Sequence, residues 1–331
     1  MLNPQAKLNP KLFDLNVEQV PIRDGFGQGL VEAGEKNEQV VALCADLVES
    51  TRIEKFAKQF PERFVEMGVA EQNLVTVASG LAAMGKIPFT ASYACFSPGR
   101  NWEQIRTTIT YNDVPVKIVG AHAGISVGPD GGTHQMLEDI ALMRVLPNMV
   151  VVVPCDSVEA RKATLAIADN GKPSYIRLAR NKSAVVTTTS SPFEIGKANV
   201  LIDPDQAQVA VIACGQMVYY ALMAARQLEA EGIKVSVTNL HTIKPLDAET
   251  IHRVAANSGA VVTVEEHQVA GGMGGAVAET LAKNFPVPIE FLGVQDKYGQ
   301  SGEPGELLEH YGLGVKDIVG AVKKVIDRKK R

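Results

Sequence analysis

Short apolar segments recur along the chain, and longer stretches with helix-like periodicity separate them. A strand that is apolar throughout must be covered on both faces, which is typical of a parallel sheet with helices on each side. In the first half, the strands are expected at Val40–Leu43, Ile87–Ala91, Val116–Ala121, Met149–Val153 and Tyr175–Leu178. The helices of this half are expected at Ile22–Gly34, Leu74–Met84, Pro98–Thr110, Met136–Leu146 and Ser157–Asp169.

The alternation stops at Ser183–Ser191, a Ser- and Thr-rich segment that we interpret as a linker, and then resumes. Further strands are expected at Val209–Ala213, Lys234–Thr238, Ala260–Val264 and Ile289–Leu292. Further helices are expected at Gln216–Glu231, Asp247–Asn257, Met273–Asn284 and Val315–Arg328. The chain of 331 residues is therefore predicted to form two α/β domains, residues 1–190 and 191–331, each a mostly parallel sheet flanked by helices.

Composition excludes several classes of protein. The formal net charge of -4 argues against a nucleic-acid-binding protein. The four cysteines are scattered without a C-x-x-C pair, which favours a reducing compartment over a disulfide frame or a zinc site. Residues 1–20 look like an extended lead-in without the apolar stretch of a signal peptide, and no run approaches the ~20 apolar residues of a membrane span. We expect a cytoplasmic protein.

Glu71 lies between a glycine-containing turn and the apolar helix expected at Leu74–Met84. A carboxylate at this place has two interpretations. It can be an ordinary helix N-terminal charge that favours the dipole. It can instead be a desolvated acid in a cleft, where burial and a partner set its protonation.

The segment after Val116–Ala121 is the most unusual loop in the chain. It contains four glycines, with His122 and His134 on either side of Asp130. A surface loop, a metal site, and a site for acid–base chemistry and substrate hydrogen bonding all fit these residue types, and histidine suits proton transfer near neutral pH. The distance between the histidines in the sequence does not match a recognised metal-ligand spacing, so no metal is assigned to this chain.

Other candidate residues lie at the neighbouring strand ends. Tyr93 and Phe96 follow the strand expected at Ile87–Ala91 and are either core residues or a surface on which a flat heterocycle can stack. Arg23 opens the first helix and Arg180 follows the last strand of the first domain. Both arginines are either surface charges or parts of a phosphate clamp, because Arg favours bidentate phosphate contacts.

Several motifs together resemble the C-terminal half of the transketolases, over almost the whole chain. They are Gly68-Val-Ala-Glu-Gln-Asn73, Gly124-Ile-Ser-Val-Gly-Pro-Asp-Gly-Gly-Thr-His134-Gln, Thr242-Ile-Lys-Pro-Leu-Asp247, and Val264-Glu-Glu-His-Gln268 with Gly271-Gly-Met-Gly274. The resemblance implies a pyrimidine-binding domain followed by a transketolase C-terminal domain. It also implies the cofactor thiamine diphosphate and transfer of a two-carbon ketol unit between sugar phosphates.

The resemblance implies a role for each matching residue near the cofactor. Glu71 corresponds to the glutamate that hydrogen-bonds a ring nitrogen of the aminopyrimidine and activates the cofactor. Phe96 is similar to the aromatic residue that stacks on this ring, with Tyr93 beside it. Many relatives have a third aromatic residue where Gly99 stands, which puts that wall of the pocket in doubt.

The substrate contacts are likewise implied by the resemblance. Asp130 is similar to the residue that recognises a donor hydroxyl group, and His134 to the histidine that contacts the reacting oxygens and assists proton transfer. His267 belongs to a family signature and is interpreted as structural. The contacts with the sugar phosphate correspond to Arg23, Ser50, His122 and Arg180.

A complete transketolase also has a diphosphate-binding domain marked by Gly-Asp-Gly, which does not occur in this sequence. The resemblance therefore implies one subunit of a split enzyme in a two-plus-two assembly, with an N-terminal transketolase subunit that holds the diphosphate and Mg²⁺ or Ca²⁺. The β subunit of a 2-oxo-acid dehydrogenase and a deoxyxylulose-phosphate synthase-like enzyme are the alternatives within thiamine chemistry. A non-catalytic regulatory subunit is the alternative of another class.

Overall fold

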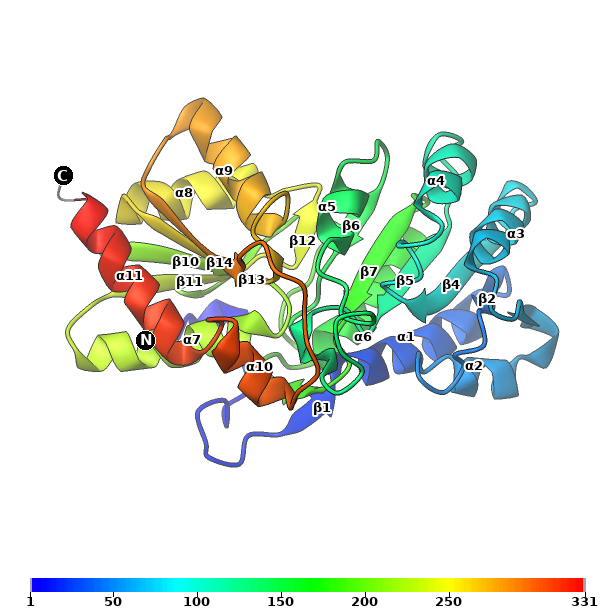
Figure 1. Cartoon of the computed structure of the whole chain (residues 1–331), viewed down its shortest axis with the longest axis horizontal. Coiled ribbons are helices and arrows are strands. Elements are labelled where there is room, and N and C mark those ends of the chain that lie inside the picture. The colour runs from blue at the N-terminus through cyan, green and yellow to red at the C-terminus, as the bar shows by residue number, and fades with distance from the viewer. Residues whose placement is uncertain (1, 330–331) are drawn as a thin grey trace.

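The computed structural model describes residues 2–329, which form two α/β layers side by side (Figure 1). The first sheet has seven strands in the order β12-β6-β7-β5-β4-β2-β3. Its members pair in parallel except β12, which runs antiparallel to β6 at the edge. The strands are β2 (Val40–Cys44), β3 (Phe64–Glu66), β4 (Ile87–Tyr93), β5 (Lys117–Ala121), β6 (Val150–Val152), β7 (Ser174–Leu178) and β12 (Thr242–Lys244).

The second sheet has five strands in the order β14-β13-β10-β11-β9, and β9 is its antiparallel edge. These strands are β9 (Asn199–Ile202), β10 (Val209–Ala213), β11 (Val235–Asn239), β13 (Val261–Gln268) and β14 (Ile289–Val294). A small antiparallel ribbon joins β1 (Gln19–Pro21) to β8 (Lys182–Ala184). The predicted fold class, mostly parallel sheets flanked by helices, is confirmed.

Helices cover both sheets, and their ends follow from local sequence. Asp156 caps the helix that starts at Ser157, because its carboxylate accepts the Glu159 N–H at 2.7 Å. Asp247 caps the helix that starts at Ala248 in the same way.

Around the first sheet lie α1 (Ile22–Lys36), α2 (Glu54–Gln59), α3 (Glu71–Ala83), α4 (Trp102–Gln104) with a π-helical continuation (Ile105–Thr110), α5 (Asp139–Arg144) and α6 (Ser157–Asp169). Around the second lie α7 (Met217–Ala230), α8 (Ala248–Ser258), α9 (Met273–Asn284), α10 (Pro304–His310) and α11 (Val315–Lys329).

Two predicted helices are shorter than expected. The helix predicted from Pro98 begins only at Trp102, and Asn101 ahead of it donates its side-chain amide to the Glu71 carbonyl at 2.8 Å. The helix predicted at Met136–Leu146 is confined to α5, since the residues before Asp139 belong to the preceding loop.

The segment Ser183–Ser191 connects the two sheets but is not a loose linker. The buried carboxylate of Asp156 accepts the backbone N–H groups of Val186 and Thr187 at 2.8 and 2.5 Å. The Lys162 ammonium donates to the carbonyls of Thr188 and Ser191. Side-chain hydrogen bonds therefore fix this polar segment against α6.

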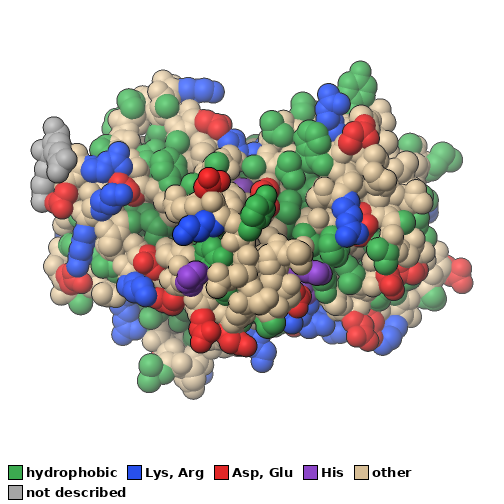
Figure 2. All heavy atoms as spheres, viewed as in Figure 1, with side chains coloured by type: hydrophobic (Ala, Val, Ile, Leu, Met, Phe, Trp, Pro, Cys, Tyr) green, Lys and Arg blue, Asp and Glu red, His purple; other side chains and the backbone are tan. Residues whose placement is uncertain are grey.

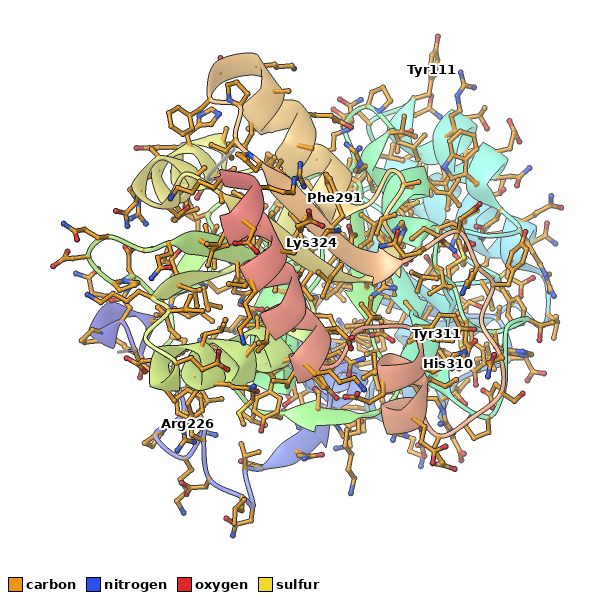
Figure 3. All side chains as sticks on the ribbon, turned by 60° about the vertical axis from the view of Figure 1, so that its left-hand side comes forward. Tyr111, Arg226, Phe291, His310, Tyr311 and Lys324 are labelled. Atoms are coloured by element: carbon orange, nitrogen blue, oxygen red, sulfur yellow. The ribbon has the colours of Figure 1, made fainter. Side chains whose placement is uncertain are left out.

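Packing crosses between the two halves of the chain. Strand β12 comes from the second half but extends the first sheet. The N-terminal residues, expected as an extended lead-in, pack on the second sheet instead, where the Asn3 N–H donates to the Leu201 carbonyl at 2.8 Å. Arg226 of α7 reaches the same segment and lies 5.1 Å from the Phe13 ring centroid (Figure 3). The two sheets therefore share one continuous packed structure.

The helices of the described residues and the face shown in Figure 2 give no sign of a membrane span or of one dominant charge. Within residues 2–329, no helix is both long enough and apolar enough to cross a bilayer. Acidic and basic side chains are interspersed on the face shown in Figure 2. This mixture agrees with the small net charge of the sequence.

Two glycines test the packing of the first layer. A Cβ atom at Gly25 of α1 would lie 1.8 Å from the Ser157 carbonyl oxygen of α6, so Gly25→Ala forces the helices apart. We expect Gly25→Ala to lower the free energy of unfolding by about 2 kcal/mol or more. The matched control is Gly80→Ala on α3, where an added Cβ meets nothing within 4 Å and should stabilise the helix by up to about 1 kcal/mol. Urea denaturation measures both; equal effects of the two changes would contradict this account of the α1–α6 contact.

Candidate active site

The candidate residues come from neighbouring strand ends of the first sheet. Tyr93 is the last residue of β4, His122 follows β5, and Arg180 comes two residues after β7. These strands pair in parallel, so their carboxyl ends lie at one edge. Loops at that edge are the usual binding loops of a parallel α/β sheet.

Four rings pack together at this edge. The Tyr93 and His122 rings stack with centroids 3.8 Å apart, and Tyr93 and Phe96 are nearly parallel at 5.9 Å. His134 meets the Phe96 ring edge-on at 5.5 Å. The structure therefore brings Tyr93, Phe96 and both histidines into one cluster, which we call the ring cluster.

His122 is held in an unusual conformation beside a cation. Its backbone is left-handed, with φ of 54°, and its side chain is buried. Arg23 lies against it, with Nη1 3.1 Å from His122 Nε2 and 2.7 Å from the Ser50 carbonyl oxygen. Burial and the charges of Arg23 and Arg180 lower the pKa of His122 to about 3. The ring is therefore neutral near pH 7.

The position of the proton on His122 follows from this contact. Because Arg23 can only donate, Nε2 accepts and Nδ1 carries the proton. His122 Nδ1 is buried and has no hydrogen-bond partner among the described residues. An N–H donor is thus available at the ring cluster.

Glu71 begins α3 and is buried, with 5% of its side chain exposed. Its carboxylate oxygens lie 3.4 and 3.5 Å from Arg100 Nη1, a long contact for an ion pair. The Arg100 guanidinium also lies 4.1 Å from the Phe96 ring centroid. Arg100 thus connects Glu71 to the ring cluster, and sequence reasoning missed it because no motif marks an arginine in the turn after an aromatic residue.

The remaining candidate residues, Arg180, Asp130 and Ser50, make fewer contacts with the ring cluster. Arg180 Nη1 donates to the Val127 carbonyl at 3.2 Å, and its charge reaches His122. Asp130 lies exposed in the loop of residues 122–134, which we call the histidine loop. Its charge and that of Glu71 add to the burial that raises the pKa of Cys95 to about 12. For Ser50, the carbonyl rather than the hydroxyl group faces Arg23.

The wall of the site at Gly99 is closed to any side chain. A Cβ atom there would lie 2.0 Å from the Cys95 carbonyl oxygen. The turn that carries Phe96 is therefore compatible with glycine alone at this position, which accounts for the missing third aromatic residue.

The site suits a flat heterocycle better than a metal ion. No group of three His, Cys, Asp or Glu side chains within residues 2–329 is close enough to hold a metal. A buried carboxylate with only a long partner, beside aromatic faces, can instead bind a ring nitrogen and its stacked ring. A wide hollow of about 820 Å³ between α1, α2 and α6 contains none of these residues.

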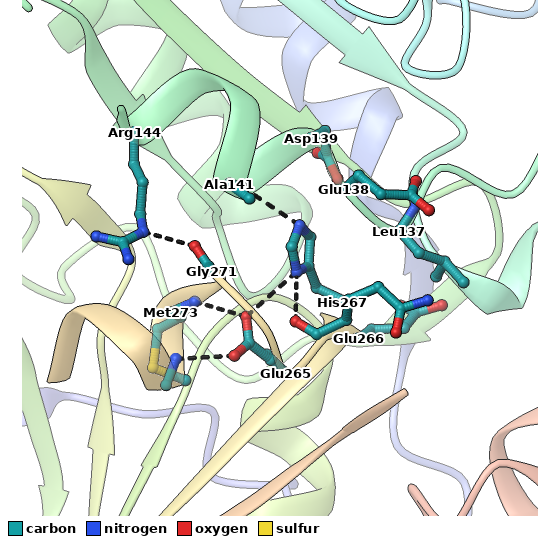
Figure 4. A network of polar contacts seen from close by, with 12 residues as sticks. Leu137, Glu138, Asp139, Ala141, Arg144, Glu265, Glu266, His267, Gly271 and Met273 are labelled. Atoms are coloured by element: carbon teal, nitrogen blue, oxygen red, sulfur yellow. Dashed lines mark hydrogen bonds and ion pairs between the residues drawn. The ribbon is translucent and has the colours of Figure 1, made fainter. Parts of the chain in front are cut away.

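The motif around His267 forms a buried polar network that sequence analysis interpreted only as structural (Figure 4). Glu265 accepts the N–H groups of Met273 and Gly274 at the start of α9, at 2.6 and 2.8 Å. Burial raises the pKa of Glu265 to about 7. Glu266 lies one residue further along β13 and points toward the histidine loop, where its carboxylate accepts the Ser126 N–H at 2.6 Å.

The chain is similar to known proteins over almost its whole length. The family model described as "Transketolase, pyrimidine binding domain" matches residues 18–184, and "Transketolase, C-terminal domain" matches residues 196–318. The chain is 41% identical over 317 residues to a 6-deoxy-6-sulfo-D-fructose transketolase subunit of Clostridium sp., covering 96% of this chain and 98% of that protein. It is 37% identical over 300 residues to an apulose-4-phosphate transketolase subunit of Phocaeicola vulgatus, covering 90% of this chain and 95% of that protein.

A solved structure is similar over nearly its whole length. It is described as a split gene transketolase, inactive beta4 tetramer, and superimposes with a TM-score of 0.87 at 45% identity. The match covers 94% of this chain and 99% of that chain.

The protonation of His122 can be tested directly. Its ring nitrogen resonances should show a neutral Nδ1–H tautomer that stays unchanged between about pH 5 and 8, because the folded chain protonates it only near pH 3. In that window the unfolded chain takes up a proton that the folded chain does not, so this residue lowers stability as the pH falls below about 6.5. Loss of the signal in His122→Gln assigns it. A titration midpoint between about pH 6 and 7 would contradict the neutral assignment.

Proposed function

The chain belongs to the transketolase family, and on this basis we propose that it is the C-terminal subunit of a split, thiamine diphosphate-dependent transketolase. It would contribute the pyrimidine-binding half of a site that transfers a two-carbon ketol unit from a ketose phosphate to an aldose phosphate. The observation that carries the proposal is the buried Glu71 carboxylate beside the ring cluster. The named relatives are transketolase subunits that act on different sugars, so the sugars of this chain are left open.

The residues of this chain fit the aminopyrimidine. Glu71 would accept a hydrogen bond from its ring, or share a proton with it, while Phe96 and Tyr93 would support its face. When bound, thiamine diphosphate supplies the carbon nucleophile for the reaction. The buried position of Glu71 supports this role, because a hydrogen bond is stronger where water is excluded.

The substrate would lie over the histidines. Arg23 and Arg180 supply two positive charges for the distal phosphate, and the neutral His122 Nδ1–H can donate to a sugar oxygen. His134 would hold or move the proton of a reacting hydroxyl group. Asp130, exposed in the loop, would accept from a donor hydroxyl group.

The remaining half of the site would come from a partner. We infer an N-terminal transketolase subunit that holds the diphosphate together with Mg²⁺ or Ca²⁺, in a two-plus-two assembly. One observation supports it: the relatives of matching length are described as transketolase subunits.

Turnover by the two-subunit complex tests this function. The partner is the product of a reading frame that carries the Gly-Asp-Gly motif, expressed together with this chain. The complex should transfer ketol units from a ketose phosphate to an aldose phosphate, and Glu71→Gln should lower kcat at least ~100-fold. Decarboxylation of a 2-oxo acid by the complex, without ketol transfer, would identify the dehydrogenase alternative and contradict the proposal.

Arg180→Met separates phosphate binding from chemistry. We expect the Michaelis constant for phosphorylated sugars to rise by roughly 10-fold to 100-fold, with kcat changed only a few-fold, because one charged contact to the distal phosphate is lost. Arg106→Met, at an exposed position on the π-helical segment, is the control. An equal loss with unphosphorylated sugars would remove the phosphate role of Arg180.

A further inference from the structure

The histidine loop is held from the inside by the C-terminal half of the chain. A glycine-rich loop loses much conformational entropy when it is ordered, so its shape needs support from fixed neighbours. Two buried side chains support the loop: Glu266 from the C-terminal half, and Gln135, which directly follows the loop and contacts both the loop and the C-terminal half.

Glu266 fixes the start of the loop. Its carboxylate accepts the Ser126 N–H at 2.6 Å, and Gln216 donates both to Glu266 and to the Ser126 hydroxyl group. A Cβ atom at Gly124 would lie 2.4 Å from this carboxylate. The Gly124 backbone, with φ of 96°, therefore rests directly on Glu266.

Gln135 fixes the end of the loop and ties it to the C-terminal half. Its Nε2 amide donates to the Ile125 carbonyl at 3.0 Å and to the Gly128 carbonyl at 3.3 Å. The same amide donates to the Gln300 carbonyl at 3.0 Å, across the junction between the two halves. Since His134 is its neighbour in the chain, Gln135 restricts where the His134 ring can lie.

The supporting strand is itself rigid. Arg177 donates to the Glu266 carbonyl at 2.7 Å and pairs with Asp139 at the start of α5 at 2.8 Å. His267 faces α5 on the other side, where its Nε2 lies 3.4 Å from the Ala141 N–H (Figure 4). Strand β13 is therefore connected to β7 through Arg177 and to α5 through His267.

We propose that Glu266 and Gln135 are positioning residues, and that the C-terminal domain serves as the template on which the histidine loop takes its substrate-binding shape. This inference rests on the proposed function in assigning the loop to the substrate. A displacement of about 1 Å in a reacting group can lower the rate ~100-fold. Loss of the contacts from Glu266 or Gln135 should therefore lower the rate of ketol transfer without any change in the residues that contact the cofactor.

Hydrogen exchange on the purified chain tests the template without a partner or a sugar. Gln135→Met keeps the side-chain volume but removes all three donated contacts. We expect exchange at the Ser126, Gly131 and His134 amides to become at least ~10-fold faster, with α3 and β4 unchanged. Glu266→Gln, which retains one acceptor oxygen, should give a smaller effect confined to Ser126.

The matched control is Gln268→Met, which removes the contacts of this side chain with the Lys297 carbonyl and the Asp296 N–H in the same region but none to the loop. In the two-subunit complex, Gln135→Met should lower kcat/KM for the ketose phosphate by roughly 10-fold to 100-fold and leave thiamine diphosphate affinity unchanged within about two-fold. Unchanged loop exchange in Gln135→Met, exchange that becomes faster throughout the chain in Gln135→Met, or the same acceleration of loop exchange in the control Gln268→Met, would overturn the proposal. Absence of ketol transfer in the wild-type complex would instead refute the proposed function, because the exchange result does not depend on it.

Discussion

The parallel register of β4, β5 and β7 is the constraint on which the site depends. Tyr93 pairs with Ala121, and Ala121 pairs with Leu178, so three strands end at one level. The residues that follow are then neighbours, although they lie far apart in the sequence. A slip of one residue in the β4–β5 pair would turn Tyr93 to the opposite face of the sheet relative to β5 and separate it from His122.

The clustered side chains differ in charge and in protonation state because their surroundings differ. Burial, together with the charges of two neighbouring arginines, lowers the pKa of His122 and keeps its ring neutral, and its Nδ1–H group has no partner among the described residues. Glu71 is connected to the rings through Arg100, which is its only charged partner among the described residues. A single sheet edge thus carries an acid, a neutral donor and cations, which is the set of groups that the proposed sugar phosphate and heterocyclic cofactor would require.

Much of this fold can be predicted from the sequence, and the elements and contacts that could not be predicted share a physical cause. The strand Val209–Ala213 and the helix Ser157–Asp169 have the predicted ends, because an apolar run and an Asp cap are local signals. Strand β12 has no such signal, since its place in the first sheet depends on a pairing with β6 that is distant in the chain. The sequence indicated the ring cluster through aromatic and histidine residues at strand ends. It could not indicate Arg100 or Gln135, whose contacts come from turns and from the packing of the two halves.

The central claim is that Glu71 and its aromatic neighbours form one half of a cofactor site whose other half is on a second polypeptide. Calorimetric titration of thiamine diphosphate, with Mg²⁺ present, tests it most directly on this chain alone, on the partner alone and on their mixture. The claim predicts tight binding only in the mixture, with one cofactor for each copy of this chain, and much weaker binding when the mixture contains Glu71→Ala. Tight binding to this chain alone, or binding in the mixture that is indifferent to Glu71→Ala, would contradict it.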